Sequence, residues 1–191
     1  MKKILSLILA VAMVLSMGIT AFAAENDVVI LYTNDVHTYI DGDLSYAHVG
    51  YLKNQLDAIL VDAGDHAQGT AYGSMDKGET IIKLMNAAGY DAATLGNHEF
   101  DWGIDKIQNY ADGNLANGEA NFPFLGANIY KAGTTERPDW IDAYTIVNYG
   151  NIEVGIIGVI GAIRGMNLAL LKSPIFIIPA AILGIALAAQ K

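Results

Sequence analysis

Residues 92–103 read AATLGNHEFDWG, and this stretch decides the expected fold. A short apolar run from Ala92 to Leu95 is typical of a buried strand, and it ends at Gly96. Ligand-type side chains follow at once, namely Asn97, His98 and, three residues later, Asp101. A strand that ends in such a polar cluster predicts a functional loop at the edge of a sheet.

Two earlier stretches have the same arrangement of an apolar run followed by a polar loop. Residues 28–32 precede NDVH at 34–37, and residues 58–61 lead into VDAGDHAQGT at 61–70. Loops beyond the strand ends of an open α/β sheet converge on one rim, so residues distant in sequence can share a site. The pattern therefore gathers Asp35, His37, Asp65, Asn97, His98 and Asp101.

Helical patterns alternate with these strands. One helix is expected over residues 77–88, because Ile81, Ile82, Met85 and Ala88 fall on one face, and Gly89 is placed to end it. Further helices are expected over residues 49–56 and 104–111, and further strands over residues 124–129, 144–149 and 152–160. The alternation predicts one α/β layered domain.

The first 24 residues have the pattern of a secretory signal peptide. Lys2 and Lys3 precede a long apolar stretch that closes on the small-x-small sequence Ala21, Phe22, Ala23. An uncleaved membrane anchor is the alternative, because the apolar stretch is nearly long enough to span a bilayer. The sequence thus predicts a signal peptide over residues 1–24 and a protein that is secreted or held at the cell surface.

The remaining chain is strongly acidic. Without Lys2 and Lys3 it has 9 basic and 20 acidic residues, a net charge of −11. A basic face that binds a nucleic-acid polymer is therefore not expected. The chain has no cysteine, which excludes thiol catalysis and cysteine-ligated zinc.

The polar loops favour a metal site, although a single Asp-x-His or Gly-Asp is most often structural. Asp, His and Asn suit Mn, Zn or Fe. A phosphate ester that meets an acidic protein needs local positive charge, which two divalent ions would supply. Asp65 is placed to bridge them. His98, with Asp101 three residues on, is expected to stabilise a transferring phosphoryl group or to protonate the leaving oxygen.

Two other histidines are weaker candidates. His48 and His66 are expected to be solvated or packing residues, although His66 adjoins Asp65 and could approach a substrate. No dinucleotide fingerprint or phosphate-cradling glycine loop is present, so a nucleotide cofactor is not indicated.

The motifs NDVH, VDAGDHAQGT and TLGNHEFDWG resemble those of the 5'-nucleotidase and 2',3'-cyclic phosphodiesterase family, over roughly residues 28–158. The resemblance implies the N-terminal part of a calcineurin-like metallophosphoesterase domain, an incomplete four-layer α/β/β/α sandwich with two divalent ions. It makes Asp35 and His37 ligands of one ion, Asp65 the bridge and Asn97 a ligand of the second ion. His98 and Asp101 become the catalytic dyad.

The chain departs from the family after about residue 159. The family supplies three further metal-binding histidines from later GH and GHxH motifs, whereas this chain has no histidine after His98. The second ion site is therefore expected to lack ligands, and catalysis to be weak or absent. The family's C-terminal domain, which holds the nucleoside, has no counterpart here, so the preferred nucleotide is unassigned.

The expected organisation is a signal peptide over residues 1–24, the N-terminal part of a metallophosphoesterase domain over 25–159, and an apolar tail over 160–191. For the tail we weigh membrane association through residues 173–190, a frameshifted ending of a truncated gene, and a buried core helix. The expected function is a metal-dependent phosphoric ester hydrolase that acts on nucleotides, truncated in this chain. The alternative is a non-catalytic metal-binding remnant, secreted or held at a membrane.

Overall fold

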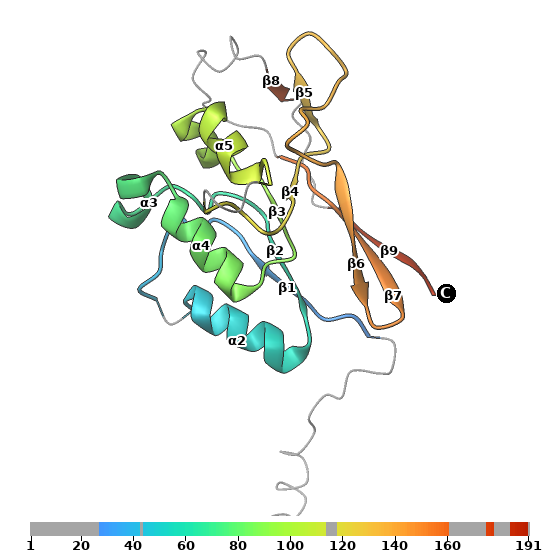
Figure 1. The fold of residues 1–191 in the computed structure, drawn as a ribbon. Coiled ribbons are helices and arrows are strands. Elements are labelled where there is room, and N and C mark those ends of the chain that lie inside the picture. Colours follow the sequence, from blue (N-terminus) through green and yellow to red (C-terminus); the bar gives the residue numbers. More distant parts are fainter. Residues whose placement is uncertain (1–26, 43, 114–117, 161–174, 178–183, 191) are drawn as a thin grey trace, which may run out of the picture.

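The computed structural model describes residues 27–42, 44–113, 118–160, 175–177 and 184–190 (Figure 1). The predicted signal peptide over residues 1–24 lies outside the described residues and stays a prediction. Within the described ranges, no helix is both long enough and apolar enough to cross a membrane.

A parallel sheet of four strands forms the middle layer, in the order β1-β2-β3-β4. The strands are β1 (Ile30–Thr33), β2 (Ile59–Asp62), β3 (Ala92–Thr94) and β4 (Phe124–Leu125). All residues of β2 and β3 are buried, as expected for apolar runs that are covered on both faces. Thr33 pairs with Asp62, so β1 and β2 end side by side at one edge of the sheet.

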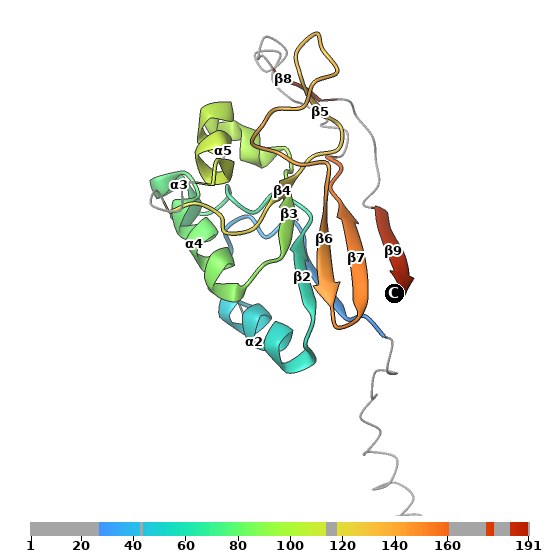
Figure 2. The ribbon, with the colours of Figure 1, turned by 45° about the vertical axis from the view of Figure 1, so that its right-hand side comes forward.

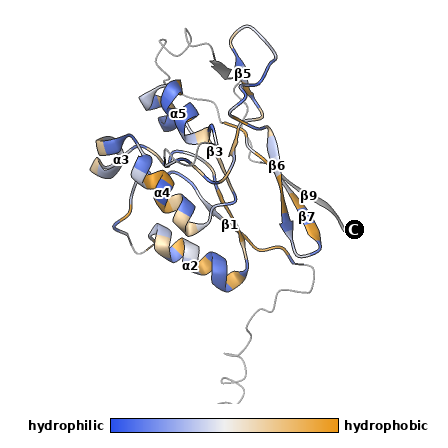
Figure 3. Cartoon of the chain, viewed as in Figure 1, coloured by the Kyte–Doolittle hydropathy of each residue, from blue (hydrophilic) through white to orange (hydrophobic). Residues whose placement is uncertain are grey.

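Helices cover one face of this sheet, namely α2 (Tyr46–Leu56), α3 (Ala71–Asp76), α4 (Glu79–Ala88) and α5 (Ile104–Ala111) (Figure 1). Hydrophobic and hydrophilic residues are mixed along α2 and α4 (Figure 3), and α4 has one buried apolar face, as an amphipathic helix does. Ile81, Ile82 and Met85 on α4 are fully buried. Gly89 ends α4 with a φ of 80°, and its N–H donates to the carbonyls of Met85 and Asn86.

A second, antiparallel sheet lies on the opposite face of the parallel sheet (Figure 2). It consists of β6 (Tyr144–Tyr149), β7 (Ile152–Ile157) and β9 (Gly184–Gln190). The two sheets share a core of small and branched side chains, which are Ile59, Val61, Ala92, Leu125, Val154 and Ile156. The described residues thus form α, β and β layers, and the expected α/β class with an incomplete four-layer sandwich is confirmed.

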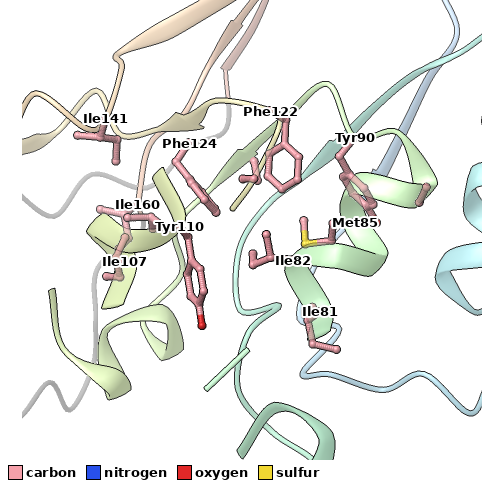
Figure 4. Close-up of a cluster of buried hydrophobic side chains, with 14 of the residues drawn as sticks. Ile81, Ile82, Met85, Tyr90, Ile107, Tyr110, Phe122, Phe124, Ile141 and Ile160 are labelled. Atoms are coloured by element: carbon pink, nitrogen blue, oxygen red, sulfur yellow. The ribbon is translucent and has the colours of Figure 1, made fainter. Parts of the chain in front are cut away.

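The larger core lies between the helices and the parallel sheet (Figure 4). Aromatic rings are a main component, and the rings of Phe122 and Phe124 meet edge to face with their centroids 5.5 Å apart. Full burial of a large apolar side chain is worth roughly 1.5–3 kcal/mol. The chain has no cysteine, so no disulfide within it adds to this packing.

The expected strand over residues 124–129 is wrong, because the chain turns within it. β4 ends at Leu125, and β5 (Ile129–Lys131) belongs to a different, two-stranded sheet with β8 (Ile175–Ile177). The Ile129 N–H donates to the Gly126 carbonyl at 3.1 Å, which closes the turn, and the Arg137 guanidinium donates to the carbonyls of Gly126 and Ala127. Gly126 and Asn128 within this segment are residues typical of turns, and the expected strand passed over them.

Several boundaries also differ from the expectation. α2 begins at Tyr46 rather than residue 49, α4 begins at Glu79 rather than residue 77, and β7 ends at Ile157 rather than residue 160. The short helix α3 and the 3-10 helix η1 (His98–Trp102) were not predicted, because neither is long enough to show a helical period.

The described part of the apolar tail consists of strands. β8 pairs with β5, and β9 pairs with β7, both antiparallel. A buried core helix is therefore wrong for residues 175–177 and 184–190. Membrane association through residues 173–190 and a frameshifted ending stay predictions.

Candidate metal centre

Three loops that follow β1, β2 and β3 lie against one another. The Asp35 N–H donates to the Gly64 carbonyl at 3.1 Å, and the His37 N–H donates to the Asp65 carbonyl at 2.9 Å. Gly96 permits the third loop to approach, because a Cβ at this position would overlap the Asp65 carboxylate. The polar residues that follow separate strands are therefore brought together, as the sequence predicted.

Asp35, His37 and Asp65 form a cluster in which each residue offers a ligand atom within 4.8 Å of the others. All three residues have a left-handed backbone, with φ values of 53°, 48° and 59°. Residues other than glycine rarely adopt this conformation, which carries a free-energy penalty of about 1–3 kcal/mol each and is concentrated at functional sites. The surrounding hydrogen bonds hold the three residues in this strained arrangement.

The chemistry of this cluster fits a divalent cation. His37 Nδ1 lies 3.0 Å from the Gln68 carbonyl, which can only accept, so Nδ1–H donates and Nε2 of the neutral ring keeps a lone pair. Burial raises the pKa of Asp65, and the nearby Glu99 carboxylate and a hydrogen bond with Asp35 raise it further. Two crowded carboxylates beside a basic imidazole nitrogen are stabilised by a bound cation.

His98 and Asp101 form a hydrogen-bonded pair beside the cluster. His98 Nδ1 lies 2.8 Å from Asp101 Oδ2, and this bond raises the pKa of His98. The His98 backbone N–H donates to Asp65 Oδ1 at 2.7 Å, and the rings of His37 and His98 lie 4.9 Å apart. The His98 side chain is 36% exposed, so a substrate at the cluster can reach it.

Asn97 lies at the start of η1, between Gly96 and His98. Its carbonyl accepts the Phe100 N–H at 3.3 Å, which begins the 3-10 turn. The His98 N–H bond to Asp65 holds this turn against the second loop. The structure thus brings the six predicted residues to one rim, and their individual roles as ligands or catalytic groups stay predictions.

Sequence reasoning missed a buried layer of charged residues beneath the loops. Glu99 is only 4% exposed and accepts four backbone N–H groups, those of Asp65, His66, Ala67 and Gly96. Nothing in the sequence marks this role except the position of Glu99 inside the GNHEFD string.

His66 belongs to the same buried layer and has no exposed surface. Its Nδ1 lies 2.7 Å from Asp62 Oδ1 and 3.7 Å from Glu99 Oε1, and its ring stacks on Phe124 at 5.8 Å. Of the interpretations for His66, the packing residue is confirmed, and the solvated residue and the substrate contact are wrong.

The stability of the metal-free chain should fall as the pH rises from about 6.5 to about 9. Burial alone would lower the pKa of His66, but the Glu99 and Asp62 carboxylates raise it to about 9 from an ordinary value of 6.5. A raised pKa stabilises the fold fully below the unfolded value, and this contribution is lost as the pH passes the folded value. Urea unfolding across this range is the measurement. His66→Gln should give a flatter profile, and parallel profiles would contradict the prediction.

Comparisons with known proteins agree with this geometry. No protein-family model matches the sequence. A snake venom 5'-nucleotidase from Gloydius brevicauda is 37% identical over 161 residues, which are 74% of this chain and 26% of that protein.

Solved structures give the same result for the fold. The 5'-nucleotidase precursor from Thermus thermophilus matches with a TM-score of 0.59 at 27% identity, over 70% of this chain and 28% of that one. The Haemophilus influenzae NAD nucleotidase matches in fold with a TM-score of 0.60 at 23% identity, over 79% of this chain and 29% of that one.

The chain spans about a quarter of the length of the curated relatives that it matches, 26% for the venom protein. The similarity nevertheless covers about three quarters of this chain, including most of the described residues. This chain is a homologue of the 5'-nucleotidases, and it has the α/β fold of their N-terminal metallophosphoesterase domain.

Proposed function

We propose that this chain is a metal-dependent hydrolase of phosphoric esters that acts on nucleotides. The observation that carries the proposal is the Asp35–His37–Asp65 cluster next to the His98–Asp101 pair, with the two histidine rings 4.9 Å apart. Similarity to a snake venom 5'-nucleotidase supports nucleotides as the substrate class.

The predicted ligands divide between two ions. Asp35 and His37 would hold one ion, Asp65 would bridge, and Asn97 would bind the second. When bound, divalent ions supply positive charge for the phosphate and lower the pKa of water. The strained backbone of the first three residues fixes their positions, so little reorganisation is needed for binding.

His98 is assigned to the transferring phosphoryl group or the leaving oxygen. Its Nδ1–H donates to Asp101, which fixes the ring orientation and leaves Nε2 for the substrate. Because the bond to Asp101 raises the pKa of His98, a larger fraction of the rings carries a proton at neutral pH. A protonated ring can donate to an anionic oxygen, as a general acid must.

Phosphate release by the 191-residue chain from a nucleoside monophosphate should require added Mn or Zn and should stop with a chelator. Asp65→Ala removes the predicted bridge and should weaken metal affinity by at least about 10–100-fold, the loss typical of groups that only support ligands. A metal titration followed by phosphate release measures both effects. Asp105→Ala, which removes an exposed carboxylate on α5, is the matched control and should leave both unchanged.

Two outcomes would contradict this proposal in different ways. Metal binding that is lost in Asp65→Ala, without phosphate release above a metal blank, would favour the non-catalytic metal-binding remnant. Phosphate release that is insensitive to the chelator would place the chemistry outside the cluster.

The proposed location is outside the cell or at its surface. The secretory pattern of residues 1–24 supports export, and the venom origin of one relative agrees with it.

A further inference from the structure

The Glu99 carboxylate connects two of the three loops that form the metal centre. Its Oε1 accepts the N–H groups of His66 and Ala67 at 2.9 and 3.0 Å. Its Oε2 accepts the N–H groups of Asp65 and Gly96 at 2.9 and 2.6 Å. One side chain therefore holds three consecutive residues of the loop after β2 and one residue of the loop after β3.

The predicted functional groups depend on these two loops. Asp65 lies on the loop after β2, and its Oδ1 accepts the His98 N–H at 2.7 Å, which fixes the start of η1. The loop after β1 has no hydrogen bond to Glu99 within the described residues and is attached through Asp65, because the His37 N–H donates to the Asp65 carbonyl. A shift of the Glu99 carboxylate would therefore move Asp65, His98 and His37 relative to one another.

Position 99 requires two hydrogen-bond acceptor oxygens on a side chain as long as that of glutamate. The Glu99 side chain is 3% exposed, so water does not replace a lost partner easily. Both carboxylate oxygens accept hydrogen bonds from backbone N–H groups, two on each oxygen. In a glutamine side chain of the same shape, the NH₂ group would face one pair of these N–H donors and could not accept from them.

We propose that Glu99 is a positioning residue of the metal centre, which sets the separation of the loops that carry Asp65 and His98. It acts through backbone N–H groups. The proposal rests on the cluster being a metal site, as in the proposed function, but not on turnover.

The test compares Glu99→Gln with the wild-type 191-residue chain. Amide hydrogen exchange of the metal-free protein should show the His98 amide exchanging at least about 10-fold faster, although Glu99 does not bond to it. Mn²⁺ affinity should fall by about 10–100-fold, as for other groups that orient metal ligands. Glu119→Gln is the matched control, because Glu119 is also a buried carboxylate, 1% exposed, and should change neither quantity.

Glu99→Asp is a second variant, which distinguishes loss of the loop positions from loss of the negative charge. It also replaces Glu99→Gln in the test if that variant does not fold. Aspartate keeps the negative charge beside His66 but is shorter by one methylene group, so the same losses are expected. Wild-type His98 exchange and wild-type Mn²⁺ affinity in a folded variant would overturn the proposal. Equal losses in Glu119→Gln would also overturn it, since they would indicate general destabilisation. Because His98 exchange needs neither metal nor substrate, absence of hydrolysis would refute the proposed function without deciding this test.

Discussion

His98→Ala should lower the rate of metal-dependent phosphate release by about 10²–10⁴-fold, the usual contribution of a general acid or base. The imidazole is held by Asp101 at 2.8 Å and stands beside the His37 ring, so its loss removes a proton donor from the proposed reaction site. The rate constant at saturating nucleotide and Mn is the measurement. Metal affinity should change little, because the bond to Asp65 comes from the His98 backbone N–H and survives.

His48→Ala is the matched control for this variant. His48 is an exposed histidine on α2, and its ring bonds to Ser45 at 3.2 Å. Its removal should leave the rate within experimental error of wild type. A rate in His98→Ala close to that of His48→Ala would exclude a catalytic role for His98, whatever the metal requirement.

His66→Ala should lower the free energy of unfolding by roughly 3–5 kcal/mol, the loss typical of removing one partner from a buried ion pair. Asp62 and Glu99 would both lose their cationic partner while remaining buried. The contact of the imidazole with Phe124 would also be lost. Small domains have a total stability of about 5–15 kcal/mol, so the variant should be severely destabilised.

Urea unfolding at about pH 6, where His66 is fully charged in the native state, measures this loss. His48→Ala is again the control, and an exposed substitution of this kind should change stability by less than about 0.5 kcal/mol. A loss below about 1 kcal/mol in His66→Ala would show that the buried carboxylates find other partners, and would contradict the ion network described above.

Local sequence patterns predicted most elements of the described fold. The apolar runs before DAGD and GNHEFD became β2 and β3, because a strand buried on both faces needs apolar side chains throughout. The run before NDVH became β1, but this strand lies at the edge of the sheet and Tyr32 is 70% exposed, so burial on both faces does not account for it. The apolar face of residues 81–88 became the buried side of α4, and Gly89 ended that helix because it adopts a positive φ without strain. These features depend on near neighbours in the chain, so the sequence displays them.

Features that depend on distant contacts were not visible. Gly126 and Asn128 permit the turn at residues 126–128, but the Arg137 guanidinium and the Asp142 carbonyl, which hydrogen-bond to that segment, come from later in the chain. The burial of His66 and the role of Glu99 likewise come from contacts between residues that lie 33 and 34 positions apart.

The sequence by itself determined which side chains follow β1, β2 and β3, and that these strands place them at one edge of the parallel sheet. Only the tertiary structure decided which atoms meet: the 4.8 Å cluster of Asp35, His37 and Asp65, their left-handed backbones, and the buried carboxylate of Glu99 beneath them. The physical reason is that the apolar residues of one segment reflect the burial of that segment alone. The distances between loops are instead set by hydrogen bonds between segments that are far apart in the sequence.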